Sequence, residues 1–449
     1  MTVMSETEAA LSGSSKYVAY PEYKDSGIEW LGKVPEHWKC CRLKHLASIK
    51  NGQDYKAVQS ESGYPVMGSG GQFAFATEFM YDKPSVLLGR KGTIDKPLHI
   101  DEPFWTVDTM YYTEMQPDTD AKYLYYLATT IQFARYSTNT ALPSMTQEHL
   151  GNYIFAVPVL TNERTQIANF LGHETAKIDT LIDKQQQLIK LLKEKRQAVI
   201  SHAVTKGISS KKGQQVPMKN SGVEWLGEVP EHWGVSQVKY AINPDTSITY
   251  GIVQAGPHIE DGIPYIKTSD MSGDELPLDG YSKTSVRIDA AYKRSKVFEG
   301  DIVVAIRASV GKSLLVPKKL DGANLTQGTA KISCGLNMLP KFLLAYLNSV
   351  PVQGFFSSIS KGATFKEITL DSLRRLPTLV PPLPEQEKLI HYIENHNEIF
   401  MKLIKSAEIQ VSLLKERRTA LISAAVTGKI DVRNWQAPTP QSQAIEETA

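Results

Sequence analysis

Cysteine is scarce in this 449-residue chain, with only Cys40, Cys41 and Cys334. Their spacing forms no CxxC pair, so it predicts neither a disulfide framework nor a zinc site. No stretch approaches the roughly 18 apolar residues that a membrane-spanning helix needs. The opening MTVMSETEAALSGSS has acidic residues and no apolar core. We therefore expect reduced thiols and a cytoplasmic location.

Catalytic motifs are also missing. MGSGG at residues 67–71 resembles a methyltransferase cofactor loop, but the nearest match to a catalytic NPPY loop is NPD at 243–245. VGKS at 310–313 lacks the leading glycine of a phosphate-binding loop, because Ile306 stands there. HETAK at 173–177 lacks the second histidine of a helix-borne zinc site, and no nuclease-type PD and D/E-x-K pair has the usual spacing. We expect no catalytic residue, cofactor or metal site in this chain, and a binding function is favoured.

Charge of neither sign dominates, since 50 Lys and Arg face 48 Asp and Glu for a net charge of +2. Locally, residues 184–212 hold eight Lys or Arg against one Glu. This run either attracts phosphates or forms a solvated helix face followed by a basic linker. The length of the chain favours two or more domains.

Internal repetition is abundant. SGIEWLGKVPEHW at residues 26–38 returns 195 residues later as SGVEWLGEVPEHW at 221–233, with eleven of thirteen positions identical. We call these two stretches the Trp segments. LKEKRQAVISHAVTKGI at 192–208 returns 222 residues later as LKERRTALISAAVTGKI at 414–430. The chain therefore runs twice through a Trp segment, a variable region and a helical segment.

Each helical segment follows a proline-containing stretch and starts near a glutamate, Glu163 or Glu385, which suits the positive end of a helix. Apolar residues then recur at heptad spacing, which predicts two long amphipathic helices able to pair in a coiled coil. We expect the pairing to be antiparallel, because only then does a pseudo-twofold axis relate the two repeated halves. The expected seam comprises Ile178, Leu181, Gln185, Leu188, Leu192 and Val199, widened by Ile182 and Ile189, and Phe400, Leu403, Ala407, Leu414 and Leu421, flanked by Ile404 and Val411. Alternatively, each stripe packs only on its own domain.

The variable regions contain short β-rich runs broken by Gly, Pro, Asp and Asn, followed by short helical pieces. This pattern predicts two mixed α/β domains and an α+β fold class. The expected boundaries are a flexible N-terminus at 1–16, a first mixed domain at 17–160, a first helical region at 161–208, a linker and second mixed domain at 209–382, a second helical region at 383–432 and a flexible tail at 433–449.

The doubled order resembles the specificity subunit of type I restriction-modification systems. The resemblance covers essentially the whole chain, and its most specific marks are SGIEWLG with VPEHW, PPLPEQEKLI, and LKEKRQAVISHAVTKG with its twin. It implies two target recognition domains that each read half of a bipartite site in double-stranded DNA, with a coiled coil in a pseudo-twofold repeat setting the spacer. It further implies a non-catalytic subunit that recruits two adenine methyltransferase subunits using S-adenosylmethionine, and through them restriction subunits that need ATP and Mg.

The recognition domains align loosely at LGRKGTIDK and AIRASVGK, each a strand, a basic turn and a second strand. Arg and Lys at strand tips suit phosphates and guanine edges. The second turn is one residue shorter at the position of Gly92, so we do not expect the turns to superimpose. The DNA-binding candidates are Arg90, Lys91, Lys96, Asn139, Thr140, Ser144, Lys267, Thr268, Arg307, Lys312, Gln327, Lys361, Thr364 and Lys366. Ordinary loop capping explains the loop residues at 139–144 and 361–366 equally well.

The Trp segments are expected to mark the start of each half and to provide two equivalent methyltransferase docking surfaces. Base stacking by their tryptophans is disfavoured, because domains that read different sequences should not share base contacts. Two other functions remain open: a coiled-coil scaffold joining two protein-binding domains, and the DNA-reading subunit of an orphan adenine methyltransferase without a nuclease. Duplex binding that falls steeply with salt would distinguish DNA recognition from the scaffold.

Overall fold

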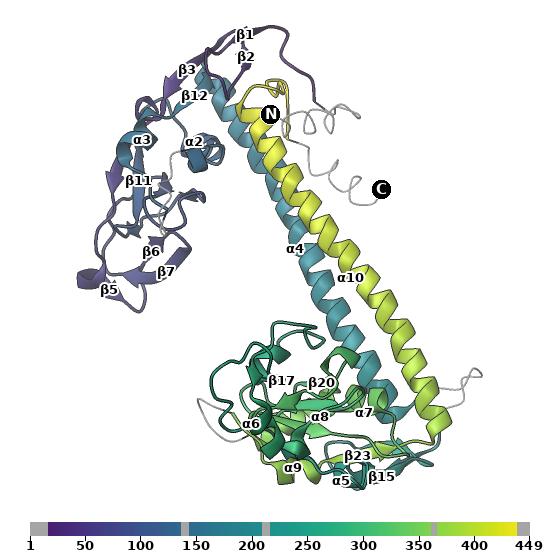
Figure 1. The fold of residues 1–449 in the computed structure, drawn as a ribbon. Coiled ribbons are helices and arrows are strands. Elements are labelled where there is room, and N and C mark those ends of the chain that lie inside the picture. Colours follow the sequence, from purple (N-terminus) through teal and green to yellow (C-terminus); the bar gives the residue numbers. More distant parts are fainter. Residues whose placement is uncertain (1–16, 136–142, 209–215, 361–365, 438–449) are drawn as a thin grey trace. The chain divides into compact units, whose positions relative to one another are not determined.

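A computed structural model describes residues 17–135, 143–208, 216–360 and 366–437 (Figure 1). The chain divides into two compact units. Unit 1 comprises Met1–Gln185 with Ile409–Ala449, and unit 2 comprises Gln186–Glu408. Each unit therefore combines one Trp segment, one mixed domain, the N-terminal part of one long helix and the C-terminal part of the other.

The two long helices are α4 (Thr161–Lys206) and α10 (Leu383–Val426), and they run antiparallel within each unit. In unit 1, Arg418 Nε lies 2.8 Å from Asp179 Oδ1. In unit 2, Lys193 Nζ lies 3.9 Å from Glu408 Oε1. Residue numbers thus rise along one helix as they fall along the other, which confirms the expected antiparallel pairing.

The seam between the helices differs in phase from the prediction. Ile182 and Ile404 are 8% and 7% exposed, whereas Leu181 and Leu403 are 46% and 48% exposed. The buried and half-buried positions follow a spacing of four and three: Ile178, Ile182, Gln185, Ile189 and Leu192 on α4, and Phe400, Ile404, Ala407, Val411 and Leu414 on α10. The prediction that Leu181, Leu188 and Leu403 lie in the seam is wrong. Neighbouring apolar residues satisfy either phase of a heptad, and packing against the partner helix selects one.

The mixed domain of unit 1 contains two four-stranded sheets, ordered β4-β11-β8-β9 and β10-β6-β7-β5. Their strands are β4 (Ala47–Asn51), β5 (Gln59–Ser60), β6 (Tyr64–Gly68), β7 (Gly71–Ala76), β8 (Ser85–Gly89), β9 (Leu98–Ile100), β10 (Trp105–Thr106) and β11 (Met110–Met115). Two helices follow, α2 (Ala121–Ala128) and α3 (Gln147–Asn152), and the side chains of Asp120 and Thr146 cap their first turns.

The mixed domain of unit 2 has sheets ordered β16-β22-β19-β20 and β18-β17-β21. Its strands are β16 (Thr249–Tyr250), β17 (Ile263–Ile266), β18 (Lys283–Thr284), β19 (Ile302–Ala305), β20 (Ser313–Leu315), β21 (Asn324–Leu325) and β22 (Thr329–Ile332), and its helices are α5 (Val238–Ala241), α6 (Val286–Ala291), α7 (Pro340–Leu347), α8 (Val350–Ile359) and α9 (Leu370–Arg374). β21 pairs in parallel with β17 just as β10 pairs in parallel with β6. The two variable regions therefore share a topology.

Each Trp segment supplies the second strand of a small hairpin, in which β1 (Tyr23–Asp25) pairs with β2 (Lys33–Pro35), or β13 (Met218–Asn220) with β14 (Glu228–Pro230). In unit 1 the strand after it, β3 (Trp38–Arg42), pairs with β12 (Ile154–Pro158), which leads into α4. In unit 2, β15 (Gly234–Gln237) pairs with β23 (Pro377–Val380), which leads into α10. The Trp segment therefore positions the start of the long helix in its own unit.

Within the described ranges, no single helix is long and apolar enough to cross a membrane. The pair α7 and α8, bent by 59°, meets the length and composition requirement only when the two helices are taken together. Phe342 of α7 and Phe356 of α8 are fully buried in the core of unit 2. Across the same ranges, no three His, Cys, Asp or Glu side chains gather in a way that could hold a metal ion.

Gly428 closes the C-terminal end of α10 against the Trp segment of unit 1. Its φ is +73°, and a Cβ at this position would lie 2.3 Å from Pro35 Cδ. We expect Gly428→Ala to lower the free energy of unfolding by about 2 to 4 kcal/mol, from left-handed strain plus overpacking. Gly222→Ala is the matched control, because its φ is +74° with nothing within 4 Å. Denaturant unfolding measures both, and equal losses would contradict a role for the Pro35 contact.

Candidate nucleic-acid interface

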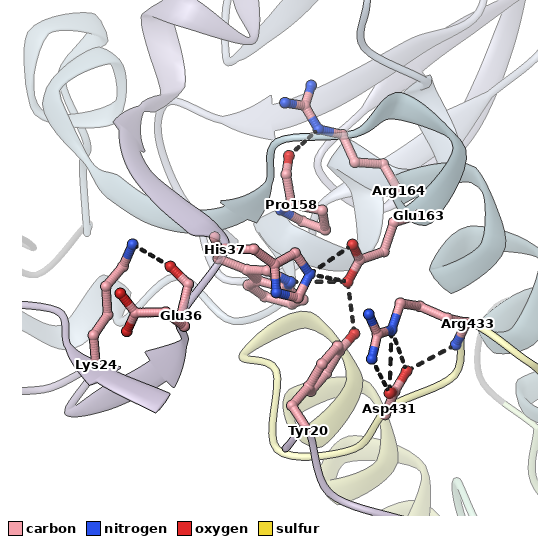
Figure 2. Close-up of polar contacts among 10 residues, drawn as sticks. Tyr20, Lys24, Glu36, His37, Pro158, Glu163, Arg164, Asp431 and Arg433 are labelled. Atoms are coloured by element: carbon pink, nitrogen blue, oxygen red, sulfur yellow. Dashed lines mark hydrogen bonds and ion pairs between the residues drawn. The ribbon is translucent and has the colours of Figure 1, made fainter. Parts of the chain in front are cut away.

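A glutamate in the first turn of α4 joins the Trp segment of unit 1 to the helix (Figure 2). Glu163 is 5% exposed. Its carboxylate accepts hydrogen bonds from Trp38 Nε1 at 2.9 Å and Tyr20 Oη at 2.8 Å, and lies 2.9 Å from His37 Nε2. Burial and the Glu163 charge raise the pKa of Tyr20, so its phenol stays a donor. The helix N-terminus adds a favourable field for the negative charge.

Unit 2 has the equivalent contacts between its Trp segment and the start of α10. Glu385 accepts from Trp233 Nε1 at 3.1 Å and lies 2.7 Å from His232 Nε2. Trp38 and Trp233 are both fully buried, so these indoles face the interior of their units. A docking surface on the Trp segments would therefore use their exposed residues and not these two indoles. The shared segment also fixes each mixed domain to the start of a helix.

The basic turn of unit 2 links β19 to β20 and is held by backbone bonds. The amides of Ile306 and Arg307 both donate to Gly328 O, at 2.9 and 3.3 Å. Ala308 N donates to Lys366 O at 3.0 Å. Ala308 has a φ of 60° and is the one non-glycine residue with positive φ within the described ranges. Such left-handed geometry at an alanine indicates that the surrounding bonds dictate the shape of the turn.

The basic turn of unit 1 links β8 to β9 and has the same bonding pattern. The amides of Arg90 and Lys91 both donate to Thr109 O, at 2.9 and 3.2 Å. Gly92 N donates to Pro143 O at 3.0 Å, and the φ of Gly92 is +81°. Gly92 is therefore the backbone counterpart of Ala308. It follows that Lys91, and not Arg90, is the counterpart of Arg307.

The two hairpins that carry these turns have equal length. Leu87 pairs with Leu98 in unit 1 and Val303 pairs with Leu314 in unit 2, and each pair encloses ten residues. The expectation that the second turn is one residue shorter is wrong. The expected gap came from aligning Arg90 with Arg307. The backbone hydrogen bonds instead align Arg307 with Lys91, and this alignment needs no gap.

In unit 1 the turn residues occupy distinct environments. Arg90 Nη1 donates to Asp108 O at 3.2 Å, and its guanidinium lies 5.9 Å from the ring centroid of Tyr111. Lys91 is exposed and forms a β-bridge with Ser144. Lys96 is exposed before β9. Arg90, Lys91 and Ser144 thus come together in the turn, and Lys96 lies in the segment that leads into β9.

In unit 2 four candidates line one open hollow of about 460 Å³: Lys267, Thr268, Arg307 and Gln327. Lys267 Nζ donates to Ser282 Oγ at 2.9 Å, and Thr268 Oγ1 donates to Gly328 O at 3.2 Å. Arg307 Nε donates to Glu367 Oε2 at 3.1 Å. The hollow therefore gathers several hydrogen-bond donors, which suits a ligand edge rich in acceptors.

The remaining candidates either do not line this hollow or lie outside the described residues. Lys312 Nζ lies 3.8 Å from Asp274 Oδ1, and Lys366 is exposed beside Glu367. Asn139, Thr140, Lys361 and Thr364 lie outside the described residues. Sequence reasoning missed Glu367 and Asp108, the contacts of the two arginines. Nothing in the local sequence marks either residue, because each reaches its arginine only through strand pairing.

Two mixed domains of one topology, each fixed to a helix of an antiparallel pair and each presenting a basic turn, define a modular two-site recognition protein. The model of the type I restriction modification DNA specificity domain matches residues 35–191 and 256–412. The chain belongs to this family of type I restriction-modification specificity subunits, whose role is non-catalytic DNA recognition.

Characterised relatives match along nearly the whole chain. The EcoBI specificity subunit of Escherichia coli is 25% identical over 450 residues, covering 95% of this chain and 93% of the relative. The EcoDI specificity subunit of Escherichia coli is 20% identical over 449 residues, covering 93% and 94%. A chain solved in work on complex assembly and conformational transition of the type I R-M system has a TM-score of 0.60 at 16% identity, covering 88% of this chain and 99% of that chain. This last likeness concerns the fold.

Proposed function

We propose that each mixed domain reads one half of a bipartite site in double-stranded DNA and that the paired helices set the unread spacer. The observation that carries this proposal is the shared backbone of the two basic turns. Lys91 stands where unit 2 has Arg307, and Ser144 stands where it has Glu367. Two domains that read different sequences need different side chains at equivalent exposed positions. The two turns provide this, because they share one backbone shape and differ in side chains.

The candidate residues divide by exposure and geometry into two kinds of contact. The exposed Lys96 and Lys366 are proposed to bind phosphates, which position a protein without reading sequence. Arg307 and Gln327 are proposed to contact base edges. The other proposed DNA contacts are Arg90, Lys91, Asn139, Thr140, Ser144, Lys267, Thr268, Lys312, Lys361 and Thr364.

The proposed partners are two adenine methyltransferase subunits, which supply S-adenosylmethionine chemistry, and restriction subunits driven by ATP and Mg, all in the cytoplasm. Exposed apolar side chains along the helices support helix-side docking of the methyltransferase subunits. They are Leu181, Leu188 and Leu191 on α4, and Ile399, Met401, Leu403, Ile409 and Leu413 on α10. The exposed residues of the two Trp segments remain the other proposed docking surface for these subunits.

Methylome sequencing tests the proposed function most directly. The expected result is a bipartite methyladenine motif in cells that express this chain with its methyltransferase subunit, and its loss when the chain is deleted. Purified chain should bind duplex DNA with an affinity that falls steeply as salt rises, because each phosphate contact releases counterions. A genome without such a motif, together with binding that ignores salt, would favour the scaffold function instead.

We expect Arg90→Ala and Arg307→Ala to impair recognition of different half-sites. Each lost base contact should cost about 1 to 3 kcal/mol at its own half. Binding to duplexes that carry one altered half-site at a time measures this effect. Lys91→Ala is the matched comparison, since Lys91 is the backbone counterpart of Arg307. Equal weakening on every sequence would assign these side chains to phosphates.

A further inference from the structure

The hollow of unit 2 has an equivalent surface in unit 1 that no sequence pattern marks. Thr326 N donates to Ile266 O at 3.1 Å, and Val107 N donates to Met67 O at 3.2 Å. In unit 2, Gln327 follows Thr326 and Lys267 follows Ile266. In unit 1, Asp108 follows Val107 and Gly68 follows Met67. Asp108 therefore occupies the place of Gln327, and Gly68 occupies the place of Lys267.

Gly68 leaves room for an aromatic ring where unit 2 has a lysine. A Cβ at position 68 would lie 3.1 Å from Phe73 Cε1, so the ring lies against the Gly68 backbone. Phe73 packs edge-on with Tyr55 at a centroid distance of 5.2 Å, yet remains 54% exposed. Val107, the residue before Asp108, places its Cγ2 atom 3.9 Å from the same Cβ position. Phe73 thus lies against Gly68, and the exposed Asp108 directly follows the residue that contacts the same position.

The two equivalent surfaces have opposite chemistry. Unit 2 presents the donors of Lys267, Arg307 and Gln327, whereas unit 1 keeps a donor only at the place of Arg307, in Lys91, and presents the carboxylate of Asp108 and an apolar ring at the rest of the surface. In the major groove a carboxylate accepts from the N4 amino group of cytosine, and an apolar side chain such as Phe contacts the methyl group of thymine. Guanine offers only acceptors at O6 and N7 and suits donors.

We infer that Asp108 and Phe73 form the pyrimidine-reading surface of the first recognition domain, Asp108 accepting from a cytosine amino group and Phe73 covering an adjacent thymine methyl. This inference rests on the proposed function and deepens it. Arg90 supports the arrangement, because its guanidinium donates to Asp108 O at 3.2 Å and so holds the loop that carries the carboxylate. The second domain reads guanine from the equivalent hollow.

The experiment uses the complex of the full chain with its methyltransferase subunits and duplexes carrying the wild-type methylation motif. Every base of each half-site is varied in turn, and methylation rates give the discrimination at that base. Asp108→Ala should reduce discrimination at one cytosine by about ten- to hundredfold, and Phe73→Ala should reduce it at a neighbouring thymine by about tenfold. Gln327→Ala should act at a guanine in the other half-site.

Matched variants control for charge and for exposed aromatic area in the same domain. Glu102→Ala removes an exposed acidic residue from the loop between β9 and β10, and Phe79→Ala removes a ring that is 44% exposed and packs on Tyr64 instead. Both should leave every base preference unchanged.

Unchanged discrimination in Asp108→Ala, or a uniform loss at all positions, would overturn the inference while leaving the bipartite motif intact. A purine at the affected position would overturn it as well. A wild-type complex that methylates no bipartite motif would instead show that the proposed function itself has failed.

Discussion

Inserting one matched heptad into both α4 and α10 should lengthen the unread spacer of the methylated motif by about three base pairs and leave both half-site sequences unchanged. Seven helical residues rise about 10.5 Å, and base pairs stack every 3.4 Å or so. A heptad also preserves the apolar seam, because it keeps Ile182 and Ile404 in phase with the partner helix. Every original site should therefore lose methylation, which makes this the largest functional change that we predict.

The insertion belongs between the Asp179–Arg418 and Lys193–Glu408 ion pairs, so that each pair keeps its own register. Methylome sequencing of cells carrying the lengthened chain reads out the new spacer. A heptad inserted into α4 alone is the control, and it should abolish methylation because the antiparallel seam no longer matches. An active doubly lengthened chain with its original spacer would show that the helices do not set the distance.

Glu163→Ala should lower the free energy of unfolding by about 3 to 5 kcal/mol, the largest stability loss that we predict. The change leaves two donors, Trp38 Nε1 and Tyr20 Oη, without their acceptor in a buried site. Each buried donor left unpaired costs about 1 to 3 kcal/mol. Glu385→Ala should cost less, about 2 kcal/mol, because Glu385 accepts from one indole and a half-exposed histidine.

Hydrogen exchange resolved along the chain locates the damage. Glu163→Ala should reduce protection around Trp38 and the start of α4, and Glu385→Ala should do so around Trp233 and the start of α10. Glu163→Gln is the conservative control, since its amide oxygen still accepts from the indole, and it should recover much of the loss. If either single change reduced protection in both units, the contacts of Glu163 and Glu385 would not be independent of each other.

The two-part architecture and the family were predictable from the sequence because their signals are local. The repeated Trp segments and the repeated helical blocks establish the doubling by identity alone. Glu163 and Glu385 after proline-containing stretches place the helix starts, heptad spacing indicates that the helices pair, and the pseudo-twofold repeat indicates that they pair antiparallel. The sequence also placed basic residues at the turn of each mixed domain, although it could not say which residues correspond.

Three features depended on contacts between residues far apart in the chain. Strand pairing aligned Arg307 with Lys91, because the bonds that define both turns come from distant carbonyls such as Thr109 O and Gly328 O. Packing chose Ile182 over its neighbour Leu181 for the seam, although both are apolar. Asp108 and Phe73 met at Gly68 only because a parallel strand pair and a hairpin converge there. Hydrophobic periodicity and the identity of the repeats can be seen in the sequence itself. Strand register and the phase of the helix seam depend on which residues far apart in the chain pair and pack at the lowest free energy.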